Sequence, residues 1–420
     1  MSSVRSRRMG AFFAGYTASM VGDQVWLTTL GWSASHLDDP LRAGLVMGAG
    51  TVPRALLMLL GGNLVDRLGI RRLALATQAG RVAVMTAAAL ITLAVPRSWV
   101  ALTVVAVVFG AIDAINLPAL GAAPAMMAPP EQLPRLTGIL QAAQRTATII
   151  GAPAAGLIIA AAETPAATIT CTVLFALALG TFLAAQLPGR SSPAADSPKA
   201  RSVDPTGIRY VLARPQLRVL AVVIACLNFT VMGCFNVGLP LLVELRGWTS
   251  TTYGIIEACF GAGAIAGSLA LAMRRPARNP VLTAACFLAI QPPLLAAVGL
   301  IPNTVAVCVA SAAVGLALGP AGSILVALIQ TGTDRSYIGR VVSVISFTSA
   351  GLTPVSYLAF AAVADIAGTP IAFVANAAIA ACAAAAMFRP SSRTAPSEDT
   401  APHENNDAKH VHAPTGQDAS

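Results

Sequence analysis

Long apolar segments recur along the entire chain, and this repetition constrains the fold more than any other feature. An apolar run of about 18 or more residues is long enough to cross a hydrocarbon core of about 30 Å as a helix. Hydrophobic residues make up 56% of the chain and charged residues only 11%, unlike a soluble domain. Twelve runs are present: residues 10–34, 43–64, 73–95, 98–120, 137–160, 166–187, 217–243, 252–273, 280–301, 304–329, 339–363 and 369–388. The sequence therefore predicts an all-α integral membrane protein with twelve transmembrane helices.

The first apolar run follows a basic segment, MSSVRSRRMG, a pattern that a cleaved signal peptide also shows. The run is too long for a signal peptide and contains Asp23, so we predict that it is the first transmembrane helix. Most of the 27 Lys and Arg residues lie in the tails and in the loops after even-numbered helices, whereas the opposite loops hold only Arg42, Arg97 and Arg246. This asymmetry predicts that both termini are cytoplasmic.

The net charge of +9 would suggest nucleic acid in a soluble protein, but the positions of the charges explain it here, and no nucleic-acid partner is expected. Arginine far outnumbers lysine and alanine is abundant, a bias typical of GC-rich bacterial genomes. The expected location is therefore a bacterial inner membrane, with the lipid bilayer as partner. A monomer is expected, although the sequence leaves the oligomeric state open.

A polar segment at residues 188–216 divides the apolar runs into two groups of six. We predict a six-helix bundle at 1–187, a cytoplasmic linker at 188–216, a second six-helix bundle at 217–389 and a disordered cytoplasmic tail at 390–420. Within the linker, Asp204 and Pro205 resemble an N-cap and a first-turn proline, which predicts a short helix on the membrane surface.

The two halves repeat each other. Pro118 matches Pro320 at an offset of 202, and the pair Gly138 and Pro153 matches Gly339 and Pro354 at an offset of 201. Chance matches occur in an alanine-rich chain, but prolines and glycines in register favour an internal duplication. Duplicated six-helix halves place a substrate site at their interface near the bilayer midplane.

The stretch GGNLVDRLGIRR lies in the predicted cytoplasmic loop between the second and third helices. Its basic residues could simply hold the loop inside. The order of its residues also resembles the G-x-x-x-D-R-x-G-R-R signature of the major facilitator superfamily, although Ile70 stands where arginine is usual. The matching positions are Gly62, Asp66, Arg67, Gly69, Arg71 and Arg72. The resemblance implies the fold of two pseudo-symmetric six-helix bundles and a cytoplasmic gate made by these residues.

Further segments narrow the resemblance within this superfamily. The Gly22 and Asp23 pair, the segment at 114–141 and GIRYVLARPQLRVL at 207–220 resemble the branch of macrolide-efflux and enterobactin-exporter proteins. That branch implies proton-coupled export of drugs or siderophores, and hence antibiotic resistance. The stretch with Gly151, Pro153 and Gly156 resembles the fifth-helix motif of antiporters, while close helix packing explains it equally well.

Six ionisable side chains lie inside the predicted spans: Asp23, Arg54, Arg81, Asp113, Arg145 and Glu257. Charges in a bilayer are costly and should pair or line a wet cavity. Asp113 and Arg145 come out at the same depth, about 10 Å from the cytoplasmic edge, which predicts that they pair. Arg81 is expected to have a structural role, because the third helix usually lies at the periphery of this fold. Glu257 is expected near a helix end, where water can reach it.

These residues supply the candidates for coupling and for the substrate pathway. We predict Asp113, Asp23, Glu257 and Arg145 as proton-coupling residues, with Asp113 as the group that titrates. The substrate-pathway candidates are Tyr16, Trp26, Asn116 and Gln141, which lie at helical spacings from the charged residues, and Arg54, which lies near the middle of the membrane.

The predicted function is secondary active export of an amphipathic small molecule by alternating access, driven by protons. No G-K-[ST] nucleotide loop can occur around Lys199 or Lys409, so a P-loop ATPase is excluded. No cofactor or metal site is expected, because the seven cysteines form no C-x-x-C pair and the four histidines lie outside the membrane core. Nutrient uptake by the same fold remains the alternative, and an integral membrane enzyme is a third hypothesis that no catalytic motif supports.

Overall fold

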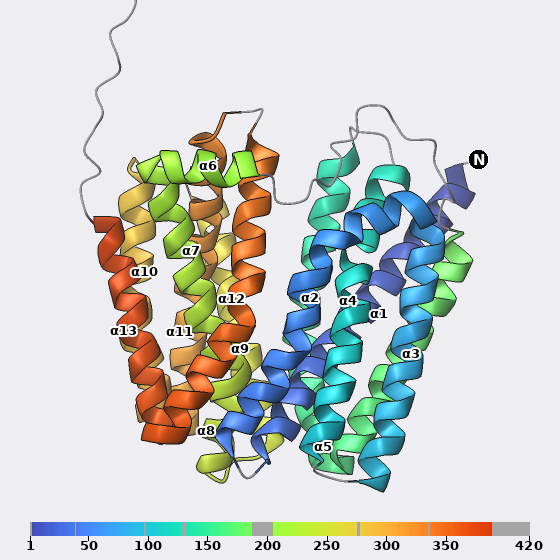
Figure 1. Cartoon of the computed structure of the whole chain (residues 1–420), viewed down its shortest axis with the longest axis horizontal. Coiled ribbons are helices and arrows are strands. Elements are labelled where there is room, and N and C mark those ends of the chain that lie inside the picture. The colour runs from blue at the N-terminus through green and yellow to red at the C-terminus, as the bar shows by residue number, and fades with distance from the viewer. Residues whose placement is uncertain are drawn as a thin grey trace, which may run out of the picture. The chain divides into compact units, whose positions relative to one another are not determined.

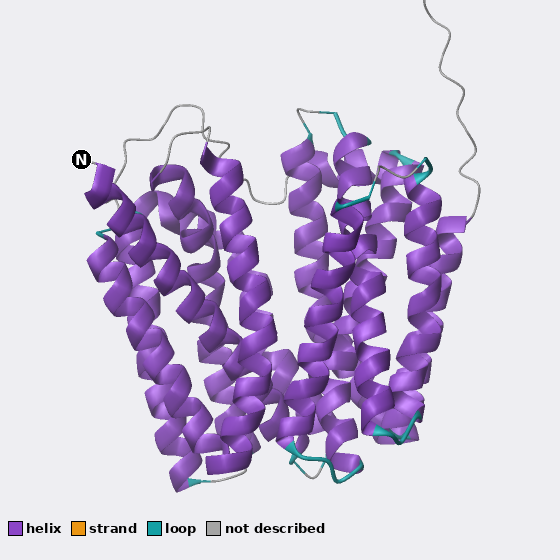
Figure 2. Cartoon of the chain, turned by 180° about the vertical axis from the view of Figure 1, so that it is seen from behind, coloured by secondary structure: helices purple, strands orange, loops and turns teal. Residues whose placement is uncertain are grey.

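The computed structural model describes residues 2–37, 39–95, 98–127, 132–186, 205–274, 278–334 and 337–388. The described residues are helical and contain no strand (Figure 2). The predicted linker segment at 188–204 and the predicted tail at 390–420 lie outside the described residues.

The described residues of the first half form five helices that make six spans, because α5 contains two spans. Non-helical backbone at Ala162 and Glu163 bends α5 between its two spans. The helices are α1 (Ser2–Ser35), α2 (Pro40–Leu68), α3 (Ile70–Ala94), α4 (Trp99–Met127) and α5 (Leu133–Ala185). Gly69 joins α2 to α3 with a φ of 79°, a conformation that glycine adopts without strain.

The second half begins with the short helix α6 (Pro205–Ala213). The seventh span is continuous through α7 (Pro215–Met232), the π-helical segment η2 (Gly233–Gly238) and α8 (Leu239–Leu245). The remaining spans are α9 (Ser250–Ala272), α10 (Pro280–Leu300), α11 (Thr304–Thr331), α12 (Ile338–Ala367) and α13 (Thr369–Phe388). The twelve predicted runs therefore all fall on helices.

Nine segments of the described residues are long and apolar enough to cross a membrane by length and composition alone. That set treats the two spans of α5 as one segment and leaves out α1 and α2. α1 carries Asp23 and other polar side chains that lower its apolar character, and α2 carries Arg42 and Arg54. The same two helices supply much of the candidate site described below.

The helices run between two ends (Figure 1), and we name one of them the linker end because α6, which falls within the predicted linker, lies there. The linker end holds the start of α1 and the helix α6, which lies across the ends of its neighbours (Figure 1). The distal end holds the end of α1, the bend of α5 and the loop between α8 and α9.

Two helix crossings join the halves near the distal end, one between α5 and α9 and one between α2 and α12. At the first crossing, a Cβ added to Gly254 would lie 2.5 Å from the carbonyl oxygen of Ala152. At the second, a Cβ added to Gly44 would collide with Ala361. Pro153 and Pro354, which the repeat relates to each other, lie at these crossings. Small residues let the helix backbones approach closely, as in other membrane bundles.

The helix α6 is fixed to the second half by a polar contact that we call the α6 clamp. The carboxylate of Asp334, in the loop between α11 and α12, accepts hydrogen bonds from Tyr210 Oη at 2.9 Å and Arg214 Nη2 at 3.0 Å. The backbone N–H of Asp334 donates back to the Tyr210 hydroxyl at 3.0 Å, and the rings of Tyr210 and Tyr337 stack with centroids 4.3 Å apart. The start of the second half is thereby held against the α11–α12 loop.

Candidate functional site

A buried ion cluster occupies the centre of the first half, and Arg81 of α3 is its hub. The Arg81 side chain has no exposed surface. Its guanidinium pairs with Asp113 of α4, and Nη1 lies 3.1 Å from Oδ1 of Asp23 in α1. Because a buried charge is stable only when it is paired and hydrogen-bonded, these two carboxylates are what allow an arginine to remain at this depth.

Neutral groups complete the surroundings of Arg81. Nη1 donates to the hydroxyl of Ser19 at 2.9 Å. The hydroxyl of Thr77 donates its hydrogen to the carbonyl oxygen of Leu73, so the Thr77 oxygen accepts a hydrogen bond from the Asn116 amide nitrogen. In this orientation the Asn116 side-chain oxygen faces both terminal nitrogens of Arg81, at 3.1 and 3.2 Å. The rings of Phe109 and Phe175 lie 5.3 and 5.1 Å from Arg81 Cζ. Polar contacts and aromatic faces together shield the guanidinium from lipid.

Asp113 is shared between two arginines that differ in their access to water. One carboxylate oxygen faces buried Arg81, and the other lies 3.4 Å from Nε of Arg54 in α2. The Arg54 side chain is 48% exposed, whereas that of Asp113 is 8% exposed. Two cations and two carboxylates, counting Asp23, make the cluster neutral when all four groups are charged.

On its accessible side the cluster borders a cavity of ≈ 270 Å³ between the two halves. Asp23, Arg54 and Asp113 line it, together with Trp26, Gln144 and Tyr357, of which Tyr357 belongs to the second half. Arg81 is not among the residues that line this cavity. The two acids can therefore exchange protons with the cavity or contact a solute in it, while Arg81 pairs with both from the buried side.

A second buried acid, Glu257 of α9, lies at the contact between the halves. Thr28 Oγ1 of α1 donates to its Oε2 at 2.9 Å, and Gln24 Nε2 of α1 does so at 3.5 Å. Tyr253, one turn earlier in α9, donates from its hydroxyl to Oε1 at 3.2 Å. Glu257 thus joins the first and second halves through neutral donors.

The structure changes three expectations about the buried charges. The expected pair of Asp113 with Arg145 is not formed: Arg145 is exposed, and the ion pairs of Asp113 are with Arg81 and Arg54. Equal depth along two helices fixes the height of two side chains but not the direction in which each points. Arg81 is not a peripheral residue, because α3 turns it inward between α1 and α4. Glu257 is only 7% exposed, so it is not a hydrated residue at a helix end.

The other predicted residues fall into three groups. Trp26 and Arg54 line the cavity, and Asn116 is buried against Arg81. Tyr16 packs in a hydrophobic cluster near Phe12, and Gln141 is exposed away from the cluster. Of the predicted gate, Arg71 and Arg72 are exposed at the start of α3. The helix α2 runs through Gly62, Asp66 and Arg67, and the predicted gate contacts of Asp66 and Arg67 lie outside what the structure describes of these residues.

Sequence reasoning missed several polar residues that the structure brings to the site. Gln78 lies one turn before Arg81 and donates to Ser19 at 2.9 Å, and Gln24 and Thr28 bind Glu257. The polar face shared by Gln78 and Arg81 was a usable signal, because a peripheral helix would not bury two such groups. No signal in the sequence linked Gln24 to a residue 233 positions away.

Known proteins resemble this chain over most of its length. The profile described as Major Facilitator Superfamily matches residues 9–356. A multidrug efflux pump, Tap, of Mycolicibacterium fortuitum is 28% identical over 393 residues, which cover 86% of this chain and 90% of that protein. A Tap protein of Mycobacterium tuberculosis (strain ATCC 25618 / H37Rv) is 26% identical over 391 residues, covering 88% and 90%.

Solved structures share the fold at low sequence identity. A bacterial homologue of the human lysosomal transporter Spinster, inward-facing and unoccupied, has a TM-score of 0.74 at 15% identity, covering 92% of this chain and 97% of that one. A bacterial homologue of the iron transporter ferroportin, also inward-facing, has a TM-score of 0.74 at 14% identity, covering 92% and 99%. The nucleoside transporter NupG has a TM-score of 0.71 at 12% identity, covering 92% and 99%. Twelve spans in two halves, a central polar cavity and the match over residues 9–356 agree: this chain is a multi-pass membrane transporter of the major facilitator superfamily.

Proposed function

We propose that the chain is a proton-coupled exporter of amphipathic small molecules in a bacterial inner membrane. The observation that carries the proposal is Asp113, held between buried Arg81 and cavity-lining Arg54. A carboxylate with one permanent partner and one exposed partner can change its charge without leaving Arg81 alone, because Asp23 also pairs with that guanidinium.

The coupling step follows from this arrangement. When a proton from the cavity neutralises Asp113, the attraction to Arg54 at 3.4 Å is lost, and the half-exposed Arg54 side chain is free to turn within the cavity. When Asp113 loses the proton, the pair re-forms. Protonation of Asp113 makes the cavity more positive by one charge, so proton binding and the binding of a positively charged solute at Asp113 oppose each other.

Glu257 links the same chemistry to alternating access. Its donors Thr28 and Gln24 belong to the first half, so separation of the halves at the distal end would break both hydrogen bonds and admit water. The protonation of Glu257 is then linked to the conformation. Asp113 is the acid that faces the solute, and Glu257 is the acid whose hydrogen bonds depend on contact between the two halves at the distal end.

Orientation follows from charge. With the linker end in the cytoplasm, the crossings at Gly254 and Gly44 close the external side, and the conformation is inward-facing, as in the Spinster and ferroportin homologues. Relatives named as multidrug efflux pumps support export. In cells, deletion of the gene should raise retention of ethidium, whereas loss of growth on a single nutrient after deletion would indicate uptake instead.

The test of coupling uses proteoliposomes that contain the full chain. Asp113→Asn should abolish solute-driven proton movement and lower gradient-driven accumulation at least tenfold, while solute exchange without a gradient continues. Asp365→Asn is the matched control, because Asp365 is an exposed carboxylate near the end of α12. Wild-type proton movement in Asp113→Asn would exclude Asp113 as the proton carrier.

A further inference from the structure

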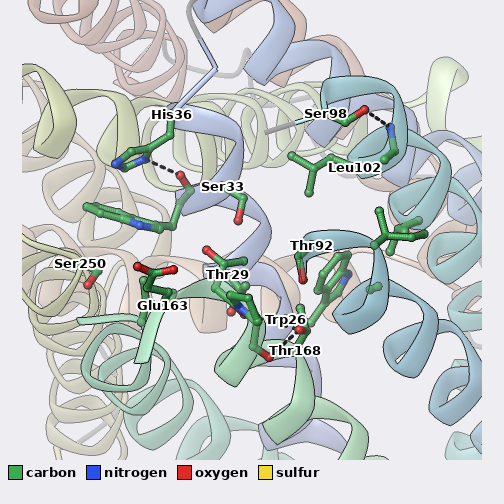
Figure 3. A pocket seen from close by; sticks show the side chains of 18 of the residues that line it. Trp26, Thr29, Ser33, His36, Thr92, Ser98, Leu102, Glu163, Thr168 and Ser250 are labelled. Atoms are coloured by element: carbon green, nitrogen blue, oxygen red, sulfur yellow. Dashed lines mark hydrogen bonds between the residues drawn. The ribbon is translucent and has the colours of Figure 1, made fainter. Parts of the chain in front are cut away.

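A second, larger cavity is formed by residues near the distal end, and Figure 3 shows its lining. None of the four charged residues of the ion cluster lines it. Its volume is ≈ 570 Å³, within the range of sites that enclose drug-sized ligands. Four helices of the first half (α1, α3, α4 and α5) form most of its wall, and Thr249 and Ser250 at the start of α9 complete it from the second half. We call this cavity the distal pocket.

The distal pocket combines one carboxylate with aromatic rings. Glu163 of α5 lines it, as do the indole rings of Trp26 and Trp32 of α1. Glu163 is exposed to the pocket, and the described residues offer it no ion-pair partner. A carboxylate and indole rings that line one pocket attract an organic cation, because the negative charge of the carboxylate and the ring quadrupoles both favour positive charge.

The backbone of Glu163 has a strained conformation, so holding its side chain in the distal pocket costs free energy. Its φ of 61° and ψ of −178° lie in a region that glycine adopts and other residues rarely do. The conformation occurs at the bend of α5 and turns Glu163 into the distal pocket, where Figure 3 draws it near Ser250 and Thr29. Glycine would make the same bend without strain but would supply no carboxylate.

Polar atoms on the wall are also unsatisfied. The hydroxyl of Ser33 is buried and has no hydrogen-bond partner among the described residues. His36 directs Nδ1 to the carbonyl oxygen of Trp32 at 2.9 Å, which leaves Nε2 for another group. Buried polar groups are rarely left without partners, so the Ser33 hydroxyl points to a bound molecule or solvent in the pocket.

We propose that the distal pocket is a binding site for lipophilic organic cations, held by Glu163 and the two indole rings, and separate from the central cavity. With the linker end in the cytoplasm, this site faces the exterior. Ser250 donates from its hydroxyl to the Gly156 carbonyl oxygen at 2.9 Å, so the second half closes one wall only while the halves touch. A bound cation therefore stabilises the conformation with a closed distal end. Trp26 lines both cavities, so the occupant also fixes a ring of the central cavity.

The experiment measures equilibrium binding of tetraphenylphosphonium to the full chain in lipid nanodiscs, with tetraphenylborate as a probe of the same shape and opposite charge. The wild type should prefer the cation. Glu163→Gln should weaken binding of the cation about tenfold and that of the borate little. Asp39→Asn is the matched control, because it removes a distal carboxylate that does not line the pocket.

Trp32→Ala should also weaken binding of the cation. Trp99→Ala, which changes an exposed indole outside the pocket, should leave that binding unchanged.

Glu163→Gly separates an effect on binding from an effect on folding. Relief of the backbone strain at residue 163 should raise the melting temperature by about 1–2 °C, while cation binding falls as in Glu163→Gln. Equal binding of cation and borate by the wild type would identify a lipid-filled pocket and overturn the proposal. Unchanged cation binding in Glu163→Gln would overturn it as well. Neither result bears on Asp113, because this assay measures binding without transport.

Discussion

The two halves share a fold but differ in what they bury. In the first half, α3 and α4 carry Arg81 and Asp113, which pair. The corresponding helices of the second half, α10 and α11, bury neutral Gln291 and Ser311, whose polar side-chain atoms have no hydrogen-bond partner among the described residues. Glu257 is the only buried carboxylate among the described residues of the second half, and it faces the first half.

The two halves are therefore similar in helix packing but different in the polar groups that they bury. The crossings that join the halves are alike, with a glycine against a backbone or small side chain on each side. The ion cluster and the distal pocket both belong mainly to the first half. The second half supplies walls for both cavities and carries the α6 clamp.

The strongest test of the difference is one substitution made in both halves. Arg81→Met should destabilise the protein by about 3–5 kcal/mol, because it leaves Asp113 and Asp23 as buried acids without their shared partner. Gln291→Met should be neutral or stabilising, since the Gln291 amide atoms already lack partners. Thermal unfolding in detergent checks both. Equal destabilisation would mean that the two cores are alike and that the cluster is only packing.

The next test asks whether the two crossings are equivalent. Gly44→Ala and Gly254→Ala should each make contact between the two halves at the distal end less favourable by about 1–3 kcal/mol. The new methyl group would meet Ala361 in the first variant and the Ala152 carbonyl oxygen in the second. Distances between spin labels at the distal end should lengthen in both variants. Gly48→Ala is the control in the same helix, because its Cβ would make an ordinary contact of 3.5 Å with Pro354. A response from one crossing alone would show that the halves close asymmetrically.

The smallest expected effect concerns the α6 clamp, a feature of the second half. The Tyr210 hydrogen bond, followed by Arg214, lowers the pKa of Asp334 below its ordinary value. A lowered pKa in the folded state means that the clamp stabilises above the unfolded pKa and is lost as the pH falls through the folded pKa, below about pH 4. Hydrogen exchange of α6 should therefore accelerate at acidic pH. Asp334→Asn should show the faster exchange already at pH 7, and no change in that variant would show that aromatic stacking alone holds α6.

The membrane class, the twelve spans and the division into halves could be predicted from the sequence alone, because the apolar length and loop charge that specify a span are local properties. The sequence also identified Asp23, Asp113 and Glu257 as candidate coupling residues and placed Gly69 at a turn that needs a positive φ. The family follows from the motifs and is shown by the match over residues 9–356.

Which charged side chains pair with each other could be read only from the packing of the helices. Helical spacing gives the depth of a residue but not the rotation of its helix, so Asp113 could be matched to Arg145 by height although α3 directs Arg81 to it. The contact of Glu257 with Gln24 and Thr28, and the meeting of Glu163 with Trp32 in one pocket, depend on packing between distant segments. Pairing inside a membrane is a property of the assembled bundle, because each partner is stable there only when the other helix brings its counterpart.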